Sequence, residues 1–393
     1  MARVYIEPSG RQVLPFDDAP ADIPIGNRPL SEWQKEMLAE AGLQRMDSPT
    51  PPCLVIPDNL FTTGPVLSRF VSQAAGRNAV LVLKRSLFGK STTPVQSHVT
   101  ATEQGWRFEK VRWVSDGGDD GEPVEVVIDP EEDRFEMPLP PGLGGKAEIA
   151  LPRHPVMTLH HWVHILWANQ AAAASIARRV PKWKWVVRAL WAVIRGLSGN
   201  KWRVLGKINN IGGGCDIHPT AVIEGSTLGD NVTVGPHARI LFSTIGDGAN
   251  IMTGAQVEVS TVGPNAVVAQ LTTLRGSVLY PEAFAGQYLM QACVLGRRAI
   301  TTGAGFSMDV NFDRDIRVPL DGELHSTGTQ FLGSAFGHNS RIGTGFWLAS
   351  GRSIPNGAFV TRHPRDVIAR IPDAAGDGRP WVNNGGTLVA LDK

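Results

Sequence analysis

The stretch Ile211–Leu279 decides the fold of this chain: IGGGCDIHPTAVIEGSTLGDNVTVGPHARILFSTIGDGANIMTGAQVEVSTVGPNAVVAQLTTLRGSVL. Steps of six, six and then five residues from Ile211 always reach an aliphatic residue, at Ile217, Ile223, Leu228, Val234, Ile240, Ile245, Ile251, Val257, Val262, Val268, Leu274 and Leu279. The residue four positions after each of the first twelve is small or β-branched. This period predicts a parallel β-helix, in which short strands turn aliphatic side chains into a prism. One coil cannot bury its own apolar edge, so the coils must stack.

Four glycines recur at the same spacing of seventeen residues, at Gly212, Gly229, Gly246 and Gly263. Corners of a solenoid often need a positive φ, which glycine adopts without steric cost. We therefore expect these glycines to mark one corner of the prism by a positive φ.

The repeat is interrupted near the C-terminal end. It loosens after Leu279, resumes around Val294 and Ile300, and breaks over residues 306–331. It then returns at six-residue steps, at Phe336, Ile342, Leu348, Ile354 and Val360. The interruption is rich in charged residues, and insertions in solenoids project from one face and often carry function. We predict a loop or hairpin that leans over the edge of a neighbouring coil.

Composition and charge bound the remaining possibilities. The chain has 393 residues and a formal net charge of +1, which gives no global attraction to nucleic acid. Its three cysteines lie far apart without metal-like spacing, which fits a reducing compartment. The N-terminus lacks the apolar core of a signal peptide, and no apolar run of about 18 residues could span a bilayer. A cytoplasmic location is the expectation.

Charge divides the chain into regions. Residues 115–136 hold ten acidic residues and one arginine, whereas residues 149–215 hold ten lysines and arginines and no acidic residue. We predict an α/β domain over 1–150, a basic, Trp-rich helical arm over 151–207, the β-helix over 208–363 and a tail over 364–393. Within the first domain, strands are predicted at 4–6, 53–56, 80–83 and 107–114, and helices at 30–41 and 65–75.

The N-terminal domain resembles a known family. The stretch from Asp17 to Gln34, DDAPADIPIGNRPLSEWQ, is similar to the start of sugar-phosphate nucleotidyltransferases, and Leu54–Phe61 is similar to the strand that carries their metal-binding aspartate. The resemblance implies a Rossmann-like fold with a nucleotide and metal site at Gly10, Arg11 and Asp58. The family's glycine-rich loop is shortened here, and Ala21-Asp22 replaces its lysine. We therefore expect a reduced domain with a vestigial site, and Mg²⁺ only if this domain is active.

The arm allows two interpretations. Its sequence predicts a helix over 156–179 and a second from Pro181 to about Leu197, with Trp and aliphatic residues on one face and cations on the other. Such a face is typical of a helix on anionic lipid, so residues 181–203 could contact the inner membrane face. Alternatively, the apolar face packs on the β-helix or on another subunit. His160 and His164 lie one turn apart but form an incomplete ligand set, so no metal is predicted.

The interruption and the last coils carry a second resemblance. Gly303–Gly305, Ile316–Val318, Thr327-Gly328, Leu332–Gly337 and Gly351–Gly357 look like the acetyltransferase half of two-domain sugar-nucleotide enzymes. The resemblance implies a left-handed β-helix that forms a homotrimer, with acetyl-CoA or another acyl-CoA in the groove between two subunits. In that family a histidine removes a proton while an amine attacks the thioester.

Candidate residues follow from this chemistry. A histidine titrates near neutral pH and suits a general base, and arginines suit the phosphates of CoA. The predicted catalytic residues are His338 first and His325 second. The predicted cofactor-binding residues are Arg341, Gly351, Arg352 and Arg362, and the predicted acceptor-binding residues are Asp309, Asn311 and Asn339.

The leading functional hypothesis is an acyl-CoA-dependent, preferentially acetyl, transferase. Its acceptor would be an amino sugar, a sugar phosphate or a sugar nucleotide used in cell-surface polysaccharide or glycolipid synthesis. One alternative is a non-catalytic trimeric scaffold that contacts the membrane through the arm. A second alternative is an active sugar-1-phosphate nucleotidyltransferase, which would require Arg11 and Asp58 to suffice alone.

Overall fold

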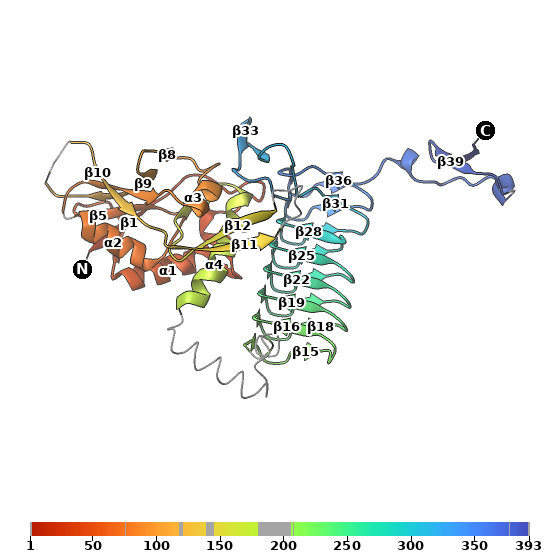
Figure 1. Cartoon of the computed structure of the whole chain (residues 1–393), viewed down its shortest axis with the longest axis horizontal. Helices are drawn as coiled ribbons and strands as arrows, with labels where there is room; N and C mark the ends of the chain where they lie inside the picture. The colour runs from red at the N-terminus through yellow and green to blue at the C-terminus, as the bar shows by residue number, and fades with distance from the viewer. Residues whose placement is uncertain are drawn as a thin grey trace.

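An α/β domain and a β-helical prism lie side by side, and the C-terminal tail extends away from the prism (Figure 1). The computed structural model describes residues 2–74, 76–117, 121–138, 145–179, 206, 208–376 and 378–391. Among these residues, no helix combines the length and apolarity that crossing a membrane requires.

The N-terminal domain is built on one mixed sheet with the strand order β10-β7-β9-β5-β1-β4. Its strands are β1 (Arg3–Glu7), β4 (Gln44–Met46), β5 (Cys53–Pro57), β7 (Ala79–Lys84), β8 (Val99–Ala101, beside β9), β9 (Gly105–Val114) and β10 (Val124–Ile128). Its helices are η1 (Pro20–Asp22), α1 (Leu30–Ala41), α2 (Gly64–Ala74) and α3 (Leu87–Thr92). The predicted α/β layer is confirmed, and Gly42 ends α1 with φ of 65° as a C-cap glycine should.

Other described strands of this half of the chain pair outside the mixed sheet. They are β2 (Pro24–Ile25), β3 (Arg28–Pro29), β6 (Leu60–Phe61), β11 (Glu132–Pro138), β12 (Lys146–Pro152) and β13 (Met157–Thr158). Because β13 pairs with β6, the chain is extended there, and helix α4 (Trp162–Arg179) begins six residues later than predicted. The predicted second helix and the proposed membrane contact at 181–203 lie outside the described residues.

The prism has three faces of parallel strands, as the repeat predicts for a left-handed β-helix. The first face contains β14 (Asn210–Ile211), β17 (Thr227–Leu228), β20 (Thr244–Ile245), β23 (Thr261–Val262), β26 (Val278–Leu279), β29 (Val294–Leu295), β34 (Ala335–Phe336) and β37 (Ser353–Ile354). The second contains β15 (Asp216–Ile217), β18 (Thr233–Val234), β21 (Asn250–Ile251), β24 (Val267–Val268), β27 (Phe284–Ala285), β30 (Ile300–Thr301), β35 (Arg341–Ile342) and β38 (Phe359–Val360). The third contains β16 (Val222–Glu224), β19 (Arg239–Leu241), β22 (Gln256–Glu258), β25 (Thr273–Arg275), β28 (Leu289–Gln291), β31 (Phe306–Ser307) and β36 (Trp347–Leu348).

The aliphatic residues of the repeat fill the prism, and those from Leu228 to Leu279 are at most 2% exposed. The predicted loosening of the repeat after Leu279 amounts to one residue: Ala285 and Met290 continue the buried column, but the step between them is five residues instead of six. The next coil is one residue shorter, since Val278 pairs with Val294. Leu295 and Thr301 therefore point inward in place of the predicted Val294 and Ile300, since neighbouring strand residues face opposite sides.

The four period-seventeen glycines do not have the positive φ that was predicted. The positive φ falls two residues later at the same corner, as at Gly214, Asn231, Gly248 and Asn265. The glycines are instead required by the approach of the next coil. A Cβ on Gly246 would lie 2.5 Å from the backbone nitrogen of Pro264, and one on Gly263 would lie 2.6 Å from that of Pro281. Close stacking of backbones excludes any side chain there.

The interruption starts later than predicted, because Phe306 still belongs to β31. A backbone hydrogen bond from Leu332 N to the Asp309 carbonyl closes the base of the excursion. The excursion contains a hairpin of β32 (Arg317–Leu320) and β33 (Glu323–Ser326). The predicted hairpin is present, but it leans on the N-terminal domain of its own chain rather than only on a neighbouring coil, since Val318 and Leu320 share one core with Phe88 and Val95.

Helix α4 joins the two parts of the molecule. One hydrophobic cluster contains Trp162 and Leu166 of the helix, Phe16 of the N-terminal domain and Val278 of the prism. The described part of the arm is thus an internal packing element that covers the first face at β26 and β29, whereas described residues such as Phe359 on the second face and Trp347 on the third are exposed. The tail beyond the prism contains η3 (Pro364–Asp366), η4 (Asp373–Gly376) and the hairpin of β39 (Trp381–Asn384) and β40 (Thr387–Ala390).

Candidate functional site

His338, the first predicted base, lies in the contact between the prism and the N-terminal domain. Its side chain is on the loop between β34 and β35, and the residue is 8% exposed. Its Nε2 lies 3.0 Å from Asp18 Oδ1, and its Nδ1 accepts a hydrogen bond from Arg297 N at 2.8 Å. The ring also packs against Phe16 and Tyr280, with both centroids 5.1 Å away.

These bonds fix the tautomer of His338. Because Nδ1 accepts the Arg297 N–H, the ring proton is on Nε2, which donates it to Asp18. Asn356 reinforces the contact, since its Nδ2 donates to the Phe16 carbonyl and to Asp17 Oδ2. Both nitrogens of His338 are therefore engaged within this chain, and the residue joins two domains.

Two predicted cofactor residues hold the excursion. Gly351 has φ of 71°, and a Cβ there would lie 2.6 Å from Ile316 Cγ2 and 2.8 Å from the Arg317 carbonyl oxygen. Arg352 donates from its guanidinium to that same Arg317 carbonyl at 2.8 Å. These contacts explain both residue types. Position 351 requires glycine because the excursion backbone passes too close for a Cβ, and position 352 uses arginine because its long side chain reaches the Arg317 carbonyl.

The other predicted binding residues are spread over the last coils. Arg341 is exposed on β35, and Arg362 is exposed beyond β38 with its side chain next to Gly345. Asn339 is exposed with φ of 55° and donates its backbone N–H to the Arg297 carbonyl. Only Arg341 and Arg362 of this group offer exposed guanidinium groups on a face that the N-terminal domain leaves open.

Asp309 and Asn311 lie at the base of the excursion. Burial raises the pKa of Asp309, partly opposed by a backbone N–H and by Arg275. Asn311 donates its backbone N–H to the Gln330 carbonyl, and its side-chain oxygen accepts from Asp313 N at 3.3 Å. These side chains and backbone groups shape the neck of the excursion, where Asp309 is half-buried.

His325, the second predicted base, lies on the hairpin of the excursion. It is paired with Val318 across β32 and β33 and is half-buried. The hairpin turns at Asp321 and Gly322, which both have positive φ, as a tight two-residue turn requires. His325 is thus held at a defined position on a projecting element.

The vestigial site predicted in the N-terminal domain is used by the fold itself. Gly10 has φ of 67° in the loop after β1, and Asp58 Oδ1 accepts the Ser9 N–H at 3.0 Å. Arg11 forms an ion pair of 3.3 Å with Asp321 at the tip of the excursion hairpin. The residues do not fit Mg²⁺, because Asp58 is bound to the loop and the nearby Glu7 is held by Lys110.

The histidines at the start of α4 serve structure. His164 Nδ1 accepts the backbone N–H groups of His160 and His161, and its Nε2 lies 3.3 Å from the Pro94 carbonyl. Burial lowers the pKa of all three, to about 4 for His160 and His161. Among the described residues, no group of three or more metal-ligating side chains is close enough to hold a metal ion.

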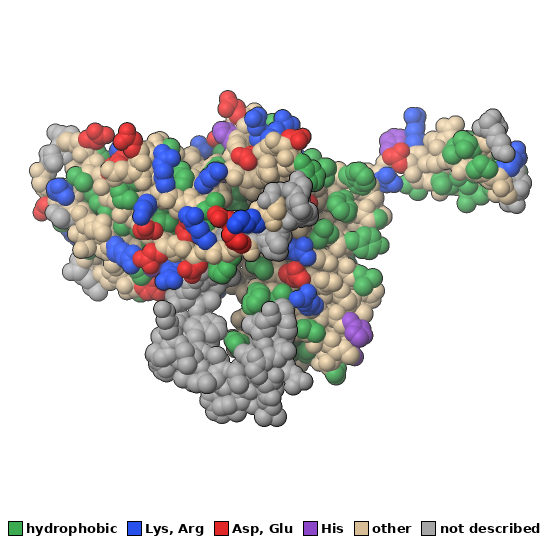
Figure 2. Space-filling view, viewed as in Figure 1, with side chains coloured by type: hydrophobic (Ala, Val, Ile, Leu, Met, Phe, Trp, Pro, Cys, Tyr) green, Lys and Arg blue, Asp and Glu red, His purple; other side chains and the backbone are tan. Residues whose placement is uncertain are grey.

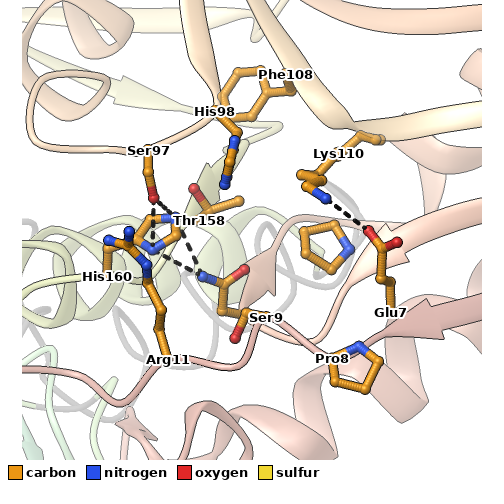
Figure 3. Close-up of a pocket in the computed structure, with 13 residues that line it drawn as sticks. Glu7, Pro8, Ser9, Arg11, Ser97, His98, Phe108, Lys110, Thr158 and His160 are labelled. Carbon is orange, nitrogen blue, oxygen red and sulfur yellow. Dashed lines mark hydrogen bonds and ion pairs between the residues drawn. The ribbon is translucent and has the colours of Figure 1, made fainter.

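The N-terminal domain contains a pocket that was not predicted from the sequence. It measures about 80 Å³ and lies where β1 and β5 end, lined among others by Arg11, Asn59, His98, Lys110 and His160. Figure 3 shows Arg11, His98, Lys110 and His160 around one space. From β1 the chain continues to β4 on one side of the sheet, and from β5 it continues through α2 to β7 on the other side. The strand order therefore reverses between β1 and β5, and open α/β sheets bind ligands at such a point. No local motif reveals the pocket, because its residues come from five separate segments.

Comparison with known proteins adds little to the site. No family model and no curated protein matches the chain. Among solved structures it is similar to a Bacillus cereus protein described as an acetyltransferase, with 16% identity and a TM-score of 0.21 over 40% of this chain and 80% of that chain. It is also similar to a hexapeptide transferase family protein from Anaplasma phagocytophilum, with 19% identity and a TM-score of 0.17 over 38% and 76%. Identities and TM-scores this low carry no argument about activity or site residues.

Proposed function

We propose that the protein is an acyl-CoA-dependent transferase, with acetyl-CoA as the first donor to test. The acceptor would be an amino sugar, sugar phosphate or sugar nucleotide used in cell-surface polysaccharide or glycolipid synthesis. One observation carries the proposal: among the described residues, two faces of the prism present exposed side chains, and a histidine-bearing hairpin projects from its last coils. An extended pantetheine chain needs a long, regular surface, and the transfer needs a base beside it.

In this proposal His325 is the general base, because both nitrogens of His338 are engaged with Arg297 and Asp18. His325 would take the proton from the acceptor amine as the amine nitrogen attacks the thioester carbonyl; the C–S bond would then break, and the CoA thiolate would leave and take that proton from His325. Arg341 and Arg362 would bind the phosphates of CoA. Gly351 and Arg352 would position the excursion, since they contact it directly.

The proposed active form is a homotrimer, in which the groove between two prisms completes the site. Large apolar side chains on the open faces support this assembly: Ile300 and Phe359 on the second face are 38% and 73% exposed, and Phe306 and Trp347 on the third are 46% and 82% exposed. Figure 2 shows hydrophobic side chains over these upper coils. Phe306 and Trp347 are paired neighbours on β31 and β36, and adjacent exposed apolar side chains of this kind mark interaction sites.

Binding of the donor tests the proposal first. Acetyl-CoA and CoA should raise the melting temperature, because a ligand that binds only the folded protein stabilises it by mass action. Release of free CoA should then be followed with a thiol reagent in the presence of amino-sugar acceptors. Absence of both stabilisation and CoA release at millimolar donor would overturn the proposal.

A matched pair of variants tests the role of His325. His325→Ala should lower kcat by about 10²–10⁴-fold with little effect on donor affinity, as expected for loss of a general base. His363→Ala removes another exposed histidine near the last coil and should leave kcat unchanged. Equal rates for wild type and His325→Ala would show that the base is a different group.

The second candidate function is a non-catalytic trimeric scaffold. It is favoured by the engagement of His338, Gly351 and Arg352 in contacts between parts of this chain. A trimer in solution that neither binds acetyl-CoA nor releases CoA would establish this alternative.

A further inference from the structure

The pocket at the carboxyl ends of β1 and β5 plays no part in the proposed acyl transfer, yet it has the chemistry of a binding site. Arg11, His98 and Lys110 line it, and Glu7 is the one acidic residue among its lining residues. Glu7 is already compensated, because Lys110 Nζ lies 3.4 Å and Arg112 Nη2 3.3 Å from its carboxylate. The pocket therefore favours a negatively charged ligand.

The lowered pKa of His160, which lies in the pocket wall, also indicates positive charge nearby. Burial is the main reason why its pKa falls to about 4, and the nearby Arg11 and His98 lower it further. The ring is held by Ser97 Oγ at 3.2 Å and by Asn59 Nδ2 at 3.4 Å. His160 thus stays neutral and presents a fixed polar wall (Figure 3).

Two polar groups of the pocket have no partner among the described residues. Asn59 is 1% exposed, and its Nδ2 donates to the Leu159 carbonyl at 3.0 Å, which fixes the amide orientation. Its Oδ1 is then a buried acceptor without a donor, and Ser9 Oγ is likewise buried and unpaired. A buried polar group without a hydrogen bond is costly, so such groups point to a ligand that supplies one. The unpaired acceptor calls for a donor such as a hydroxyl.

The size of the pocket limits the ligand. A volume of about 80 Å³ corresponds to about five to eight ordered water molecules. This matches a phosphate group with a short hydroxylated chain and is too small to enclose a nucleoside triphosphate.

We propose that this pocket binds a small phosphate monoester that carries at least one free hydroxyl group. The phosphate lies between Arg11, His98 and Lys110, and the hydroxyl donates to Asn59 Oδ1 near Ser9 Oγ. The inference is independent of the proposed acyl transfer, since none of these residues takes part in it.

Arg11 is free to turn toward such a ligand. Its present partner Asp321 is 3.3 Å away, and the two side chains are 46% and 65% exposed. Exposed ion pairs of this kind contribute little, so loss of the contact with Asp321 costs Arg11 little when it turns to a phosphate. The loop that carries Ser97 and His98 also includes Val95 at φ of 68°. A β-branched residue rarely adopts such a conformation, and strain of this kind concentrates at ligand sites.

Isothermal titration calorimetry of the full chain at constant ionic strength tests the proposal. The probes are glycerol 3-phosphate, inorganic phosphate and glycerol. Glycerol 3-phosphate should bind most tightly, phosphate more weakly, and glycerol not at all. Ser9→Ala should weaken the binding of glycerol 3-phosphate but not that of phosphate, because only glycerol 3-phosphate places a hydroxyl group near Ser9.

Charge variants locate the anion. Arg11→Met should raise the Kd of glycerol 3-phosphate about tenfold or more, and His98→Asn, which tolerates the positive φ of 62°, should also weaken binding. Lys35→Met removes an exposed lysine on α1 away from the pocket and should bind like wild type. The proposal is overturned if glycerol 3-phosphate releases no heat, or if Arg11→Met and His98→Asn both bind it as tightly as Lys35→Met does.

Discussion

Acid should weaken the junction between the excursion and the N-terminal domain through His161. This residue is 2% exposed, and burial lowers its pKa from the ordinary 6.5 to about 4, partly opposed by its hydrogen bond to the Pro319 carbonyl. Since the pKa is lower in the folded protein, the unfolded chain binds the proton more readily. The contribution of neutral His161 to the free energy of unfolding is therefore fully present above pH 6.5. It is lost as the pH falls from 6.5 toward 4, by about 1.4 kcal/mol per pH unit.

The substitution His161→Gln separates this effect from other acid-sensitive groups. Glutamine keeps an N–H donor for the Pro319 carbonyl but cannot take up a proton in this range. Between about pH 7.5 and about pH 5, the wild type should therefore lose about 2 kcal/mol of unfolding free energy that the variant retains. The free energy of unfolding of His161→Gln should therefore rise relative to that of the wild type as the pH falls.

Urea unfolding followed by tryptophan fluorescence measures the difference at both pH values. His218→Gln provides the control, because it makes the same replacement at a histidine that is exposed on the prism and lies outside the excursion junction. The reasoning would be refuted if the difference between wild type and His161→Gln changed by less than about 0.5 kcal/mol, the size of ordinary surface effects.

Three further predictions concern packing and assembly. Gly263→Ala should lower the unfolding free energy by about 1–3 kcal/mol, whereas Gly213→Ala, whose Cβ would meet nothing nearer than 3.7 Å, should be close to neutral in urea titrations; equal midpoints would contradict the stacking argument. Asp18→Ala should lower thermal stability by about 1–3 kcal/mol by leaving His338 Nε2–H unpaired in a buried contact, and Asp18→Asn, which keeps an acceptor, should cost less; the reverse order would count against the tautomer. Trp347→Ser should raise the dissociation constant of the proposed trimer by roughly 30-fold, about 2 kcal/mol, in sedimentation equilibrium, and unchanged association would place the interface elsewhere.

The prism could be predicted because its signal is local. Each strand contributes one inward residue at a fixed spacing, and burial of that residue does not depend on distant segments. The elements of the N-terminal domain were predictable for the same reason, through caps such as Gly42 and short apolar runs. Predicted element boundaries were wrong where strands pair with distant segments. The pairing of β13 with β6, for example, keeps the chain extended and makes α4 begin later than predicted.

The period of the glycines could be read from the sequence, but their purpose could not. A corner glycine suggests positive φ, whereas Gly246 and Gly263 are needed because the next coil passes too close for a Cβ. That distance is a property of two stacked coils, and no single coil encodes it.

The sequence by itself determined the β-helix, the α/β domain and the presence of an interruption in the repeat, because burial at a fixed period is a property of neighbouring residues. Only the tertiary structure decided what the candidate residues do. Asp18 and His338 are 320 residues apart and meet in one hydrogen bond, and Arg352 reaches back to Arg317. The pocket with its unpaired Asn59 oxygen likewise exists only after distant segments pack. The chemistry of a histidine or an arginine depends on its partners, and here those partners come from the other domain or from the excursion.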